Sequence, residues 1–313
     1  MMNPLLLAGA FLGWGLGAND SANVFGTAVY TRIVKYSTAI ILTALFVIIG
    51  AFFDGAHGIE KLSTYAYNGG IDTGMKAFFV MLSAAITVAA MTFLKLPVST
   101  SQAVIGAIIG GGINRGATDF SAGIQFFSAW VFTPIGAMII AYVLYKFTCN
   151  KIGSKLTEFR FYEAFIRFGY IISGILGAYS LGANNVANVT AVFSGQLHML
   201  NVQQAALFGG ISIAIGVLTF SKPVMSTVGE GIVPLSQVAG FVVVIAVAIT
   251  VYIYARIGIP VSTSQAVIGA IMGIGFHLGI KTINMRVLRN ILFGWVGTPI
   301  IAGTVSFILS LFL

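Results

Sequence analysis

Apolar residues dominate this chain in long runs, and short polar stretches separate the runs. Runs of about 20 residues, the length that an α-helix needs to cross a bilayer, follow one another along the sequence. This pattern predicts an all-α polytopic membrane protein and excludes a soluble core. The expected spans of the first half are 5–30, 38–53, 77–94 and 123–145. In the second half we expect one span around 182–188 and others at 205–220, 238–254 and 287–311.

Polar residues fall inside the first span of each half at matching places. Residues 16–24 read LGANDSANV and residues 181–189 read LGANNVANV, so the two segments belong to a repeated unit. Asn and Asp are costly in hydrocarbon and mark functional sites there, while the neighbouring glycines favour a break in the helix. We therefore expect both helices to be interrupted at these segments.

A second repeat is identical in its two copies. Residues 97–108 and residues 260–271 both read PVSTSQAVIGAI. In each copy, hydroxyl and amide side chains follow a proline at the place where a helix would begin. The segments are short for ordinary spans, so we expect re-entrant segments or half-helices.

The distribution of charge predicts how the two halves are oriented. Of the 313 residues, 58% are hydrophobic and only 8% are charged, and the net charge of +8 resides mostly in short connections. The segment from Lys146 to Arg167 is rich in basic residues, so the positive-inside rule places it in the cytoplasm. Arg32 and Lys35 follow the first span, whereas the matching segment of the second half, 194–203, holds no charge. This difference favours opposite orientations of the halves.

We therefore expect two inverted-topology repeats, residues 1–149 and residues 165–313, joined by a cytoplasmic connector at 150–164. Each repeat would have about five spans, provided that the PVSTSQ segment counts as one crossing. Inverted repeats with broken helices are the architecture of many secondary transporters, which bind their ligands near the bilayer midplane. The expected location is the inner, or plasma, membrane.

The residue types in the four polar clusters indicate what could bind there. Hydroxyl and amide donors, together with the free N–H groups of a helix start, suit a tetrahedral oxyanion. Lys and Arg are missing from all four clusters, so a dianion would need positive charge from another source. A cation held by Asp20 and by neutral oxygens would supply it. Hard oxygen ligands without His or Cys suit an alkali or alkaline-earth ion.

At these residues the chain resembles the inorganic phosphate transporter (PiT) family of cation-coupled symporters. The resemblance rests on LGANDSANV, LGANNVANV and both PVSTSQ copies, and it spans nearly the whole chain. It implies phosphate bound between two inverted repeats, with sodium or protons as the coupling ion. The residues that it implies as phosphate ligands are Asn23, Thr100, Ser101, Gln102, Asn188, Thr263, Ser264 and Gln265. Those that it implies for the cation, sodium, are Asp20, Asn185, Ser99 and Ser262.

Two residues depart from the family pattern. Many members have His where this chain has Gln102 and Gln265, so a proton-relay role of such a His cannot be carried over. Sodium is therefore favoured over protons as the coupling ion. The expected partners are phosphate, sodium and the lipid bilayer, with a homodimer left open and neither a cofactor nor nucleic acid expected.

Other functions stay open at this point. A sulfate or other oxyanion permease would use the same donors, and a proton-coupled symporter of phosphate or metal phosphate would too. Asp20 favours phosphate over sulfate, because phosphate carries a proton that a carboxylate can accept. A hydrolase is not expected, because Ser101 and Ser264 have no His or Lys base in their motifs.

Overall fold

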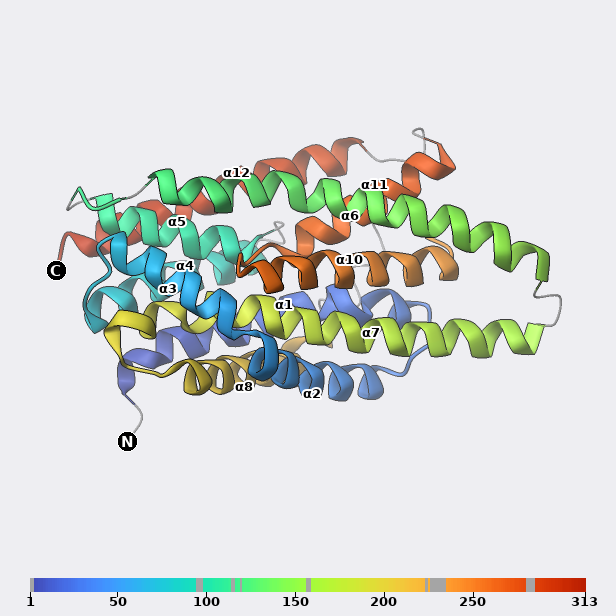
Figure 1. Cartoon of the computed structure of the whole chain (residues 1–313), viewed down its shortest axis with the longest axis horizontal. Coiled ribbons are helices and arrows are strands. Elements are labelled where there is room, and N and C mark those ends of the chain that lie inside the picture. Colours follow the sequence, from blue (N-terminus) through green and yellow to red (C-terminus); the bar gives the residue numbers. More distant parts are fainter. Residues whose placement is uncertain are drawn as a thin grey trace.

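The structure is a computed structural model that describes residues 3–93, 98–113, 116–118, 120–155, 159–222, 225, 235–279 and 285–313. The described residues form α-helices and short 3-10 turns and contain no β-strand, which confirms the all-α prediction (Figure 1). The α-helices are α1 (Leu7–Tyr30), α2 (Tyr36–Asp54), α3 (Ala56–Asn68), α4 (Gly74–Phe93), α5 (Thr100–Ile113), α6 (Phe120–Lys155), α7 (Phe159–Thr190), α8 (Val202–Phe220), α10 (Gln237–Ile257), α11 (Thr263–Leu278) and α12 (Met285–Ser310). The 3-10 turns are η1 (Pro4–Leu6), η2 (Ala191–Phe193) and η3 (Gly195–Leu197).

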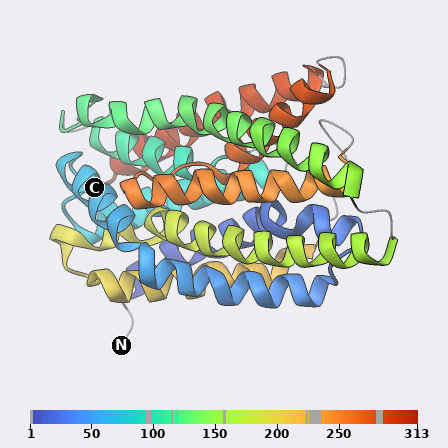
Figure 2. The same cartoon turned by 45° about the vertical axis from the view of Figure 1, so that its right-hand side comes forward.

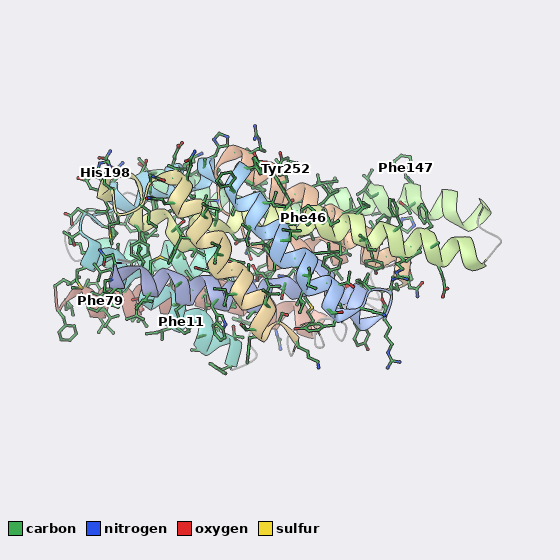
Figure 3. All side chains as sticks on the ribbon, turned by 90° about the horizontal axis from the view of Figure 1, so that it is seen from below. Phe11, Phe46, Phe79, Phe147, His198 and Tyr252 are labelled. Atoms are coloured by element: carbon green, nitrogen blue, oxygen red, sulfur yellow. The ribbon has the colours of Figure 1, made fainter. Side chains whose placement is uncertain are left out.

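Among the described residues, seven helices contain segments long and apolar enough to cross a bilayer: α2, α4, α6, α7, α8, α10 and α12. Large apolar side chains lie on their outer surfaces. Phe53 at the end of α2 is 69% exposed, and Phe147 on α6 is 62% exposed. Figure 3 shows Phe147 on the outside of the bundle. Such a surface is unfavourable in water and suits lipid tails. The chain is therefore a multi-pass membrane protein.

Glycines bring helices of the two halves into direct backbone contact in matched pairs. A Cβ on Gly17 of α1 would stand 1.9 Å from the carbonyl oxygen of Ile213 on α8. A Cβ on Gly182 of α7 would stand 2.0 Å from the carbonyl oxygen of Val47 on α2. Helix packing in a membrane depends on such close van der Waals contact between small residues. The contact of α1 with α8 thus has a counterpart in the contact of α7 with α2, in which the glycine comes from the second half instead of the first.

Two helical hairpins enter the bundle from opposite ends and turn back inside it (Figures 1 and 2). The first consists of α4 and α5, and the second of α10 and α11. The end of α5 returns to the start of its own hairpin, where Gly112 lies against the carbonyl oxygen of Gly69. The two turns meet, since the Ser264 hydroxyl donates to the carbonyl oxygen of Val98 at 3.1 Å. The expected half-helices are thus confirmed, and they begin at Thr100 and Thr263.

Several expectations about the helices are wrong. The polar segments 17–23 and 182–188 do not interrupt their helices, because α1 and α7 are continuous through them. An α-helix pairs its own backbone groups, so polar side chains can serve a site without opening the helix. The PVSTSQ helices return to their own end of the bundle, so they do not supply the fifth crossing expected of each half. No element was expected from the sequence between the spans 38–53 and 77–94, where the structure has α3.

Candidate functional site

The polar clusters predicted from the sequence lie where the hairpin turns meet α1 and α7. Every candidate residue except Asn23 and Ser264 is buried. The packing of the helices brings these residues together. Helix α1 lies beside α7, α1 contacts α11, and α7 contacts α5. Buried polar side chains at this density, inside an apolar bundle, are costly unless they are paired or bind a ligand.

A chain of side-chain hydrogen bonds links α7 to both hairpins. The Asn188 amide nitrogen donates to Ser101 Oγ on α5 at 2.9 Å and to Asn185 Oδ1 at 3.0 Å. The Asn185 amide nitrogen in turn donates to Thr263 Oγ1 on α11 at 3.1 Å. The site residues of the two PVSTSQ copies are therefore joined through two asparagines of one helix.

Helix α1 repeats part of this arrangement with a charged residue. The Asn23 amide nitrogen lies 3.4 Å from Asp20 Oδ1. This contact corresponds to the bond from Asn188 to Asn185 on α7. The Thr263 hydroxyl, which accepts the bond from Asn185, also lies beside the Asp20 carboxylate. Asp20 and Asn185 hold matching positions in the two motifs, and both lie next to Thr263. The carboxylate is 5% exposed, and it introduces the one charge of this network.

The serines that begin each half-helix act locally as caps. Ser99 Oγ accepts from the backbone N–H of Gln102 at 3.4 Å, and Ser262 Oγ accepts from that of Gln265 at 3.3 Å. Ser262 also pairs with the Ser264 hydroxyl at 2.9 Å. These bonds satisfy one backbone donor at each helix start, which stabilises the turn that presents the following residues.

Four buried polar atoms of the site have no hydrogen-bond partner among the described residues. They are Thr100 Oγ1, Gln102 Oε1, Asn188 Oδ1 and Gln265 Oε1. An unpaired buried polar atom costs about 1–3 kcal/mol, so four of them in one place favour a site that is completed by a polar ligand. All four belong to residues that the sequence motifs single out.

Asn184 lies in the motif LGANNVANV but was not among the expected ligands, and it has a structural role in the site. Its Oδ1 accepts from the backbone N–H of Val261 at 3.0 Å, and its Nδ2 donates to the carbonyl oxygen of Ile259 at 3.3 Å. It therefore holds the turn of the second hairpin against α7. The signal was present in the sequence, because Asn184 stands directly before Asn185, but only the packing shows which asparagine faces the backbone of the hairpin.

A second unexpected cluster lies where α10 approaches this turn. The Asp54 carboxylate accepts from Tyr179 at 2.5 Å, from Tyr252 at 3.2 Å and from Arg256 at 2.6 Å. Next to it, a cavity of about 430 Å³ is lined in part by His57, Glu60, Lys61 and Arg256, and its described lining includes none of the candidate site residues. Asp54 lies outside the repeated motifs, so it was not identified from the sequence.

A buried polar network inside a multi-pass helical bundle is typical of membrane transporters. The chain belongs to the phosphate transporter family, whose sequence model matches residues 16–306. A protein of Methanocaldococcus jannaschii, provisionally named a phosphate permease, is 30% identical over 99% of this chain and 97% of its own. The sulfate permease CysP of Bacillus subtilis is 28% identical over 98% of this chain and 87% of its own.

A solved structure has the same fold. It is described as the sodium-dependent phosphate transporter, and it superposes with a TM-score of 0.83 over 98% of this chain and 97% of that chain. The sequence identity is 20%, so this likeness concerns the fold.

Proposed function

We propose that the chain imports inorganic phosphate together with sodium by alternating access across the plasma membrane. The observation that carries the proposal is the buried network in which α7 joins both half-helices and leaves four polar atoms without a partner in the described part of the chain. The proposed phosphate ligands are Asn23, Thr100, Ser101, Gln102, Asn188, Thr263, Ser264 and Gln265. The proposed sodium ligands are Asp20, Asn185, Ser99 and Ser262.

The chemistry of the network supports an oxyanion with a companion cation. Its neutral hydroxyl and amide groups can donate to phosphate oxygens, but they cannot neutralise a dianion inside an apolar bundle. Sodium beside Asp20 would place positive charge next to the anion, because Thr263 stands between Asp20 and Asn185. The solved structure of the same fold is named sodium-dependent, which supports sodium over protons.

Alternating access would follow from an organisation into two inverted repeats. We propose repeats at 1–149 and 165–313 with a connector at 150–164, and a homodimer is compatible with them. The exchange of contacts between halves and the entry of the hairpins from opposite ends support this organisation. Bonds such as that between Asn188 and Ser101 cross from one repeat to the other, so rocking of the repeats would open the site to each side in turn.

Sulfate transport is the second candidate, and the similarity to a sulfate permease favours it. The two anions differ in their protons. Phosphate near neutral pH has an O–H that donates to an acceptor, whereas sulfate has none. Three of the unpaired atoms, on Gln102, Asn188 and Gln265, are amide oxygens and therefore acceptors. These acceptors suit phosphate, which can donate a hydrogen bond, better than sulfate, which cannot.

Uptake into proteoliposomes tests these assignments. We expect labelled phosphate to accumulate under an inward sodium gradient without added divalent metal, and excess sulfate to leave this uptake unchanged. Uptake driven by a proton gradient alone, or only in the presence of a divalent metal, would replace the sodium proposal with proton or metal-phosphate symport. Equal competition by sulfate would assign the chain to the wider oxyanion class.

Two amide truncations test the site itself. Gln102→Ala and Gln265→Ala should each weaken phosphate binding by about 1–3 kcal/mol, because each removes a buried polar group that faces a desolvated anion. Gln203→Ala, at an exposed position on α8, serves as the matched control. If both buried variants bind phosphate like the control, these glutamines lie outside the site.

A further inference from the structure

Two tryptophans have buried indole nitrogens with no hydrogen-bond partner among the described residues. They are Trp130 on α6 and Trp295 on α12, which occupy matching positions in the two halves. The third tryptophan, Trp14 on α1, instead donates its indole N–H to Thr219 Oγ1 at 2.9 Å. Trp295 is buried and Trp130 is half-buried, but both indole nitrogens are shut off from solvent. Such an N–H ordinarily finds a partner, so its lack among the described residues requires an explanation.

Helix packing places Trp130 at the level of Gln265. A Cβ on Gly269 of α11 would stand 2.1 Å from the carbonyl oxygen of Pro134 on α6. One turn further along both helices, a Cβ on Gly273 would stand 2.2 Å from the carbonyl oxygen of Met138. The two helices are therefore parallel and in fixed register, and one turn back from Pro134 and Gly269 are Trp130 and Gln265.

The same register recurs in the other half. Gly106 of α5 would place a Cβ 2.3 Å from the carbonyl oxygen of Pro299 on α12, and Gly110 would place one 2.0 Å from that of Gly303. One turn back from these contacts are Gln102 on α5 and Trp295 on α12. Each of these tryptophans thus shares a level with a glutamine whose Oε1 is also buried and has no partner among the described residues.

We propose that Trp130 and Trp295 bind the transported oxyanion by donating their indole N–H groups to its oxygens, beside Gln265 and Gln102. This inference rests on the proposed function, and it adds two donors that lie outside the sequence motifs. An indole nitrogen only donates, so it can pair with an anion oxygen but not with sodium. The donors carry no charge, so they orient the anion without the strong retention that a buried Lys or Arg would cause.

Variants that remove the N–H while keeping an aromatic ring test the proposal. Trp130→Phe and Trp295→Phe in proteoliposomes should each raise the KM for phosphate about tenfold, as expected for the loss of a donor to a charged group. Trp14→Phe, the matched control, should keep the wild-type KM. Replacing either tryptophan with 3-benzothienylalanine, which has sulfur in place of N–H and almost the same shape, should have the same effect without a packing defect.

A binding measurement on the full chain gives an independent readout. The three indole N–H signals of the ¹⁵N-labelled protein in nanodiscs can be assigned from the Trp→Phe variants. Inorganic phosphate should shift the signals of Trp130 and Trp295 downfield and leave that of Trp14 in place. Wild-type KM in both benzothienylalanine variants, or indole signals that do not respond to phosphate, would overturn the proposal.

The outcomes separate this proposal from the proposed function. Suppose that the wild-type chain takes up phosphate and that Gln102→Ala and Gln265→Ala weaken phosphate binding. If the tryptophan variants then behave like Trp14→Phe, only the role of the indoles is refuted. If the wild-type chain neither binds nor takes up phosphate, the proposed function itself is refuted.

Discussion

The Asn188 side chain donates to the Ser101 hydroxyl over 2.9 Å, which ties α7 in the second half of the chain to the half-helix α5 in the first. Its amide nitrogen also donates to Asn185, so both of its N–H groups are used. The remaining Oδ1 is buried and unpaired among the described residues. One side chain thus connects the two halves and presents an acceptor to the proposed ligand.

Asn188→Ala should impair both the site and the fold. It removes the partner of Ser101 and Asn185 in a buried setting, so we expect a loss of about 1–3 kcal/mol in stability and a large loss of phosphate uptake. Asn201→Ala is the control, because Asn201 caps α8 at an exposed position and its loss should cost about 1 kcal/mol without changing the KM. A normal KM for Asn188→Ala would place this residue outside the binding site.

Replacing Asn184 should have a specific local effect on the second hairpin. Asn184→Ala should release the turn of the second hairpin, because both of its bonds end on the backbone at Ile259 and Val261. Hydrogen exchange of the Val261 amide should become faster, while amides in the middle of α10 keep their protection. Asn184→Asp keeps the acceptor for Val261 and should show a smaller increase. Unchanged exchange at Val261 in the alanine variant would contradict the role of Asn184.

The repeated motifs allowed much of this site to be predicted. A proline followed by Ser, Thr, Ser and Gln indicates a capped helix start, and the helices do begin at Thr100 and Thr263. Polar residues stand out in a chain that is 58% hydrophobic, so Asp20 and Asn185 could be recognised without a structure. The continuity of α1 could not be predicted from the sequence. Glycine and asparagine weaken a helix in water but are tolerated inside a membrane bundle.

Relations that depend on packing could not be predicted. Asn184 and Asn185 are neighbours in sequence, yet one binds the backbone of a hairpin and the other binds a side chain, since adjacent residues point in different directions on a helix. The level shared by Trp130 and Gln265 follows from the register of two helices, which no local pattern specifies. Asp54 accepts hydrogen bonds from residues of two other helices, α7 and α10, which are distant from it in sequence.

Gly17 tests the close contact between α1 and α8. Gly17→Ala would place its Cβ 1.9 Å from the carbonyl oxygen of Ile213, so the helices must separate, at a cost of about 1–3 kcal/mol. Gly15→Ala is a sharp control two residues earlier on the same helix, because nothing lies within 4 Å of its Cβ position. Thermal unfolding in detergent should show a lower melting temperature for Gly17→Ala alone. Equal melting temperatures would mean that this contact does not limit the packing.

The orientation of the halves can be tested by labelling single cysteines. Lys35 lies in the connection between α1 and α2, and Gln196 lies in η3; both are exposed. In a Cys149→Ser background, Lys35→Cys should react with an impermeant maleimide from the cytoplasmic face, and Gln196→Cys should react from the opposite face. Labelling of both positions from one face would rule out the inverted repeats on which the proposed mechanism depends.

Asp20 should determine the coupling between sodium and phosphate. It is the one charged residue of the network, and its counterpart Asn185 occupies the matching position beside Thr263. Asp20 is 5% exposed and forms no ion pair with the described residues, so a bound cation would stabilise its carboxylate and would in turn neutralise the anion nearby. Asp20→Asn has nearly the same shape, and an asparagine already fills the equivalent place, so we expect the variant to fold normally.

The variant should lose the mutual dependence of the two ligands. Binding linkage is reciprocal, so if sodium strengthens phosphate binding in the wild-type chain, phosphate must strengthen sodium binding by the same factor. Calorimetric titration of sodium with and without phosphate should show this enhancement in the wild-type chain and in Asp72→Asn, whose carboxylate pairs with Lys76 outside the site. Asp20→Asn should show none, because without the carboxylate the cation has no fixed place from which to act on the anion. An Asp20→Asn variant that keeps the wild-type enhancement would assign Asp20 a structural role and place the coupling elsewhere in the network.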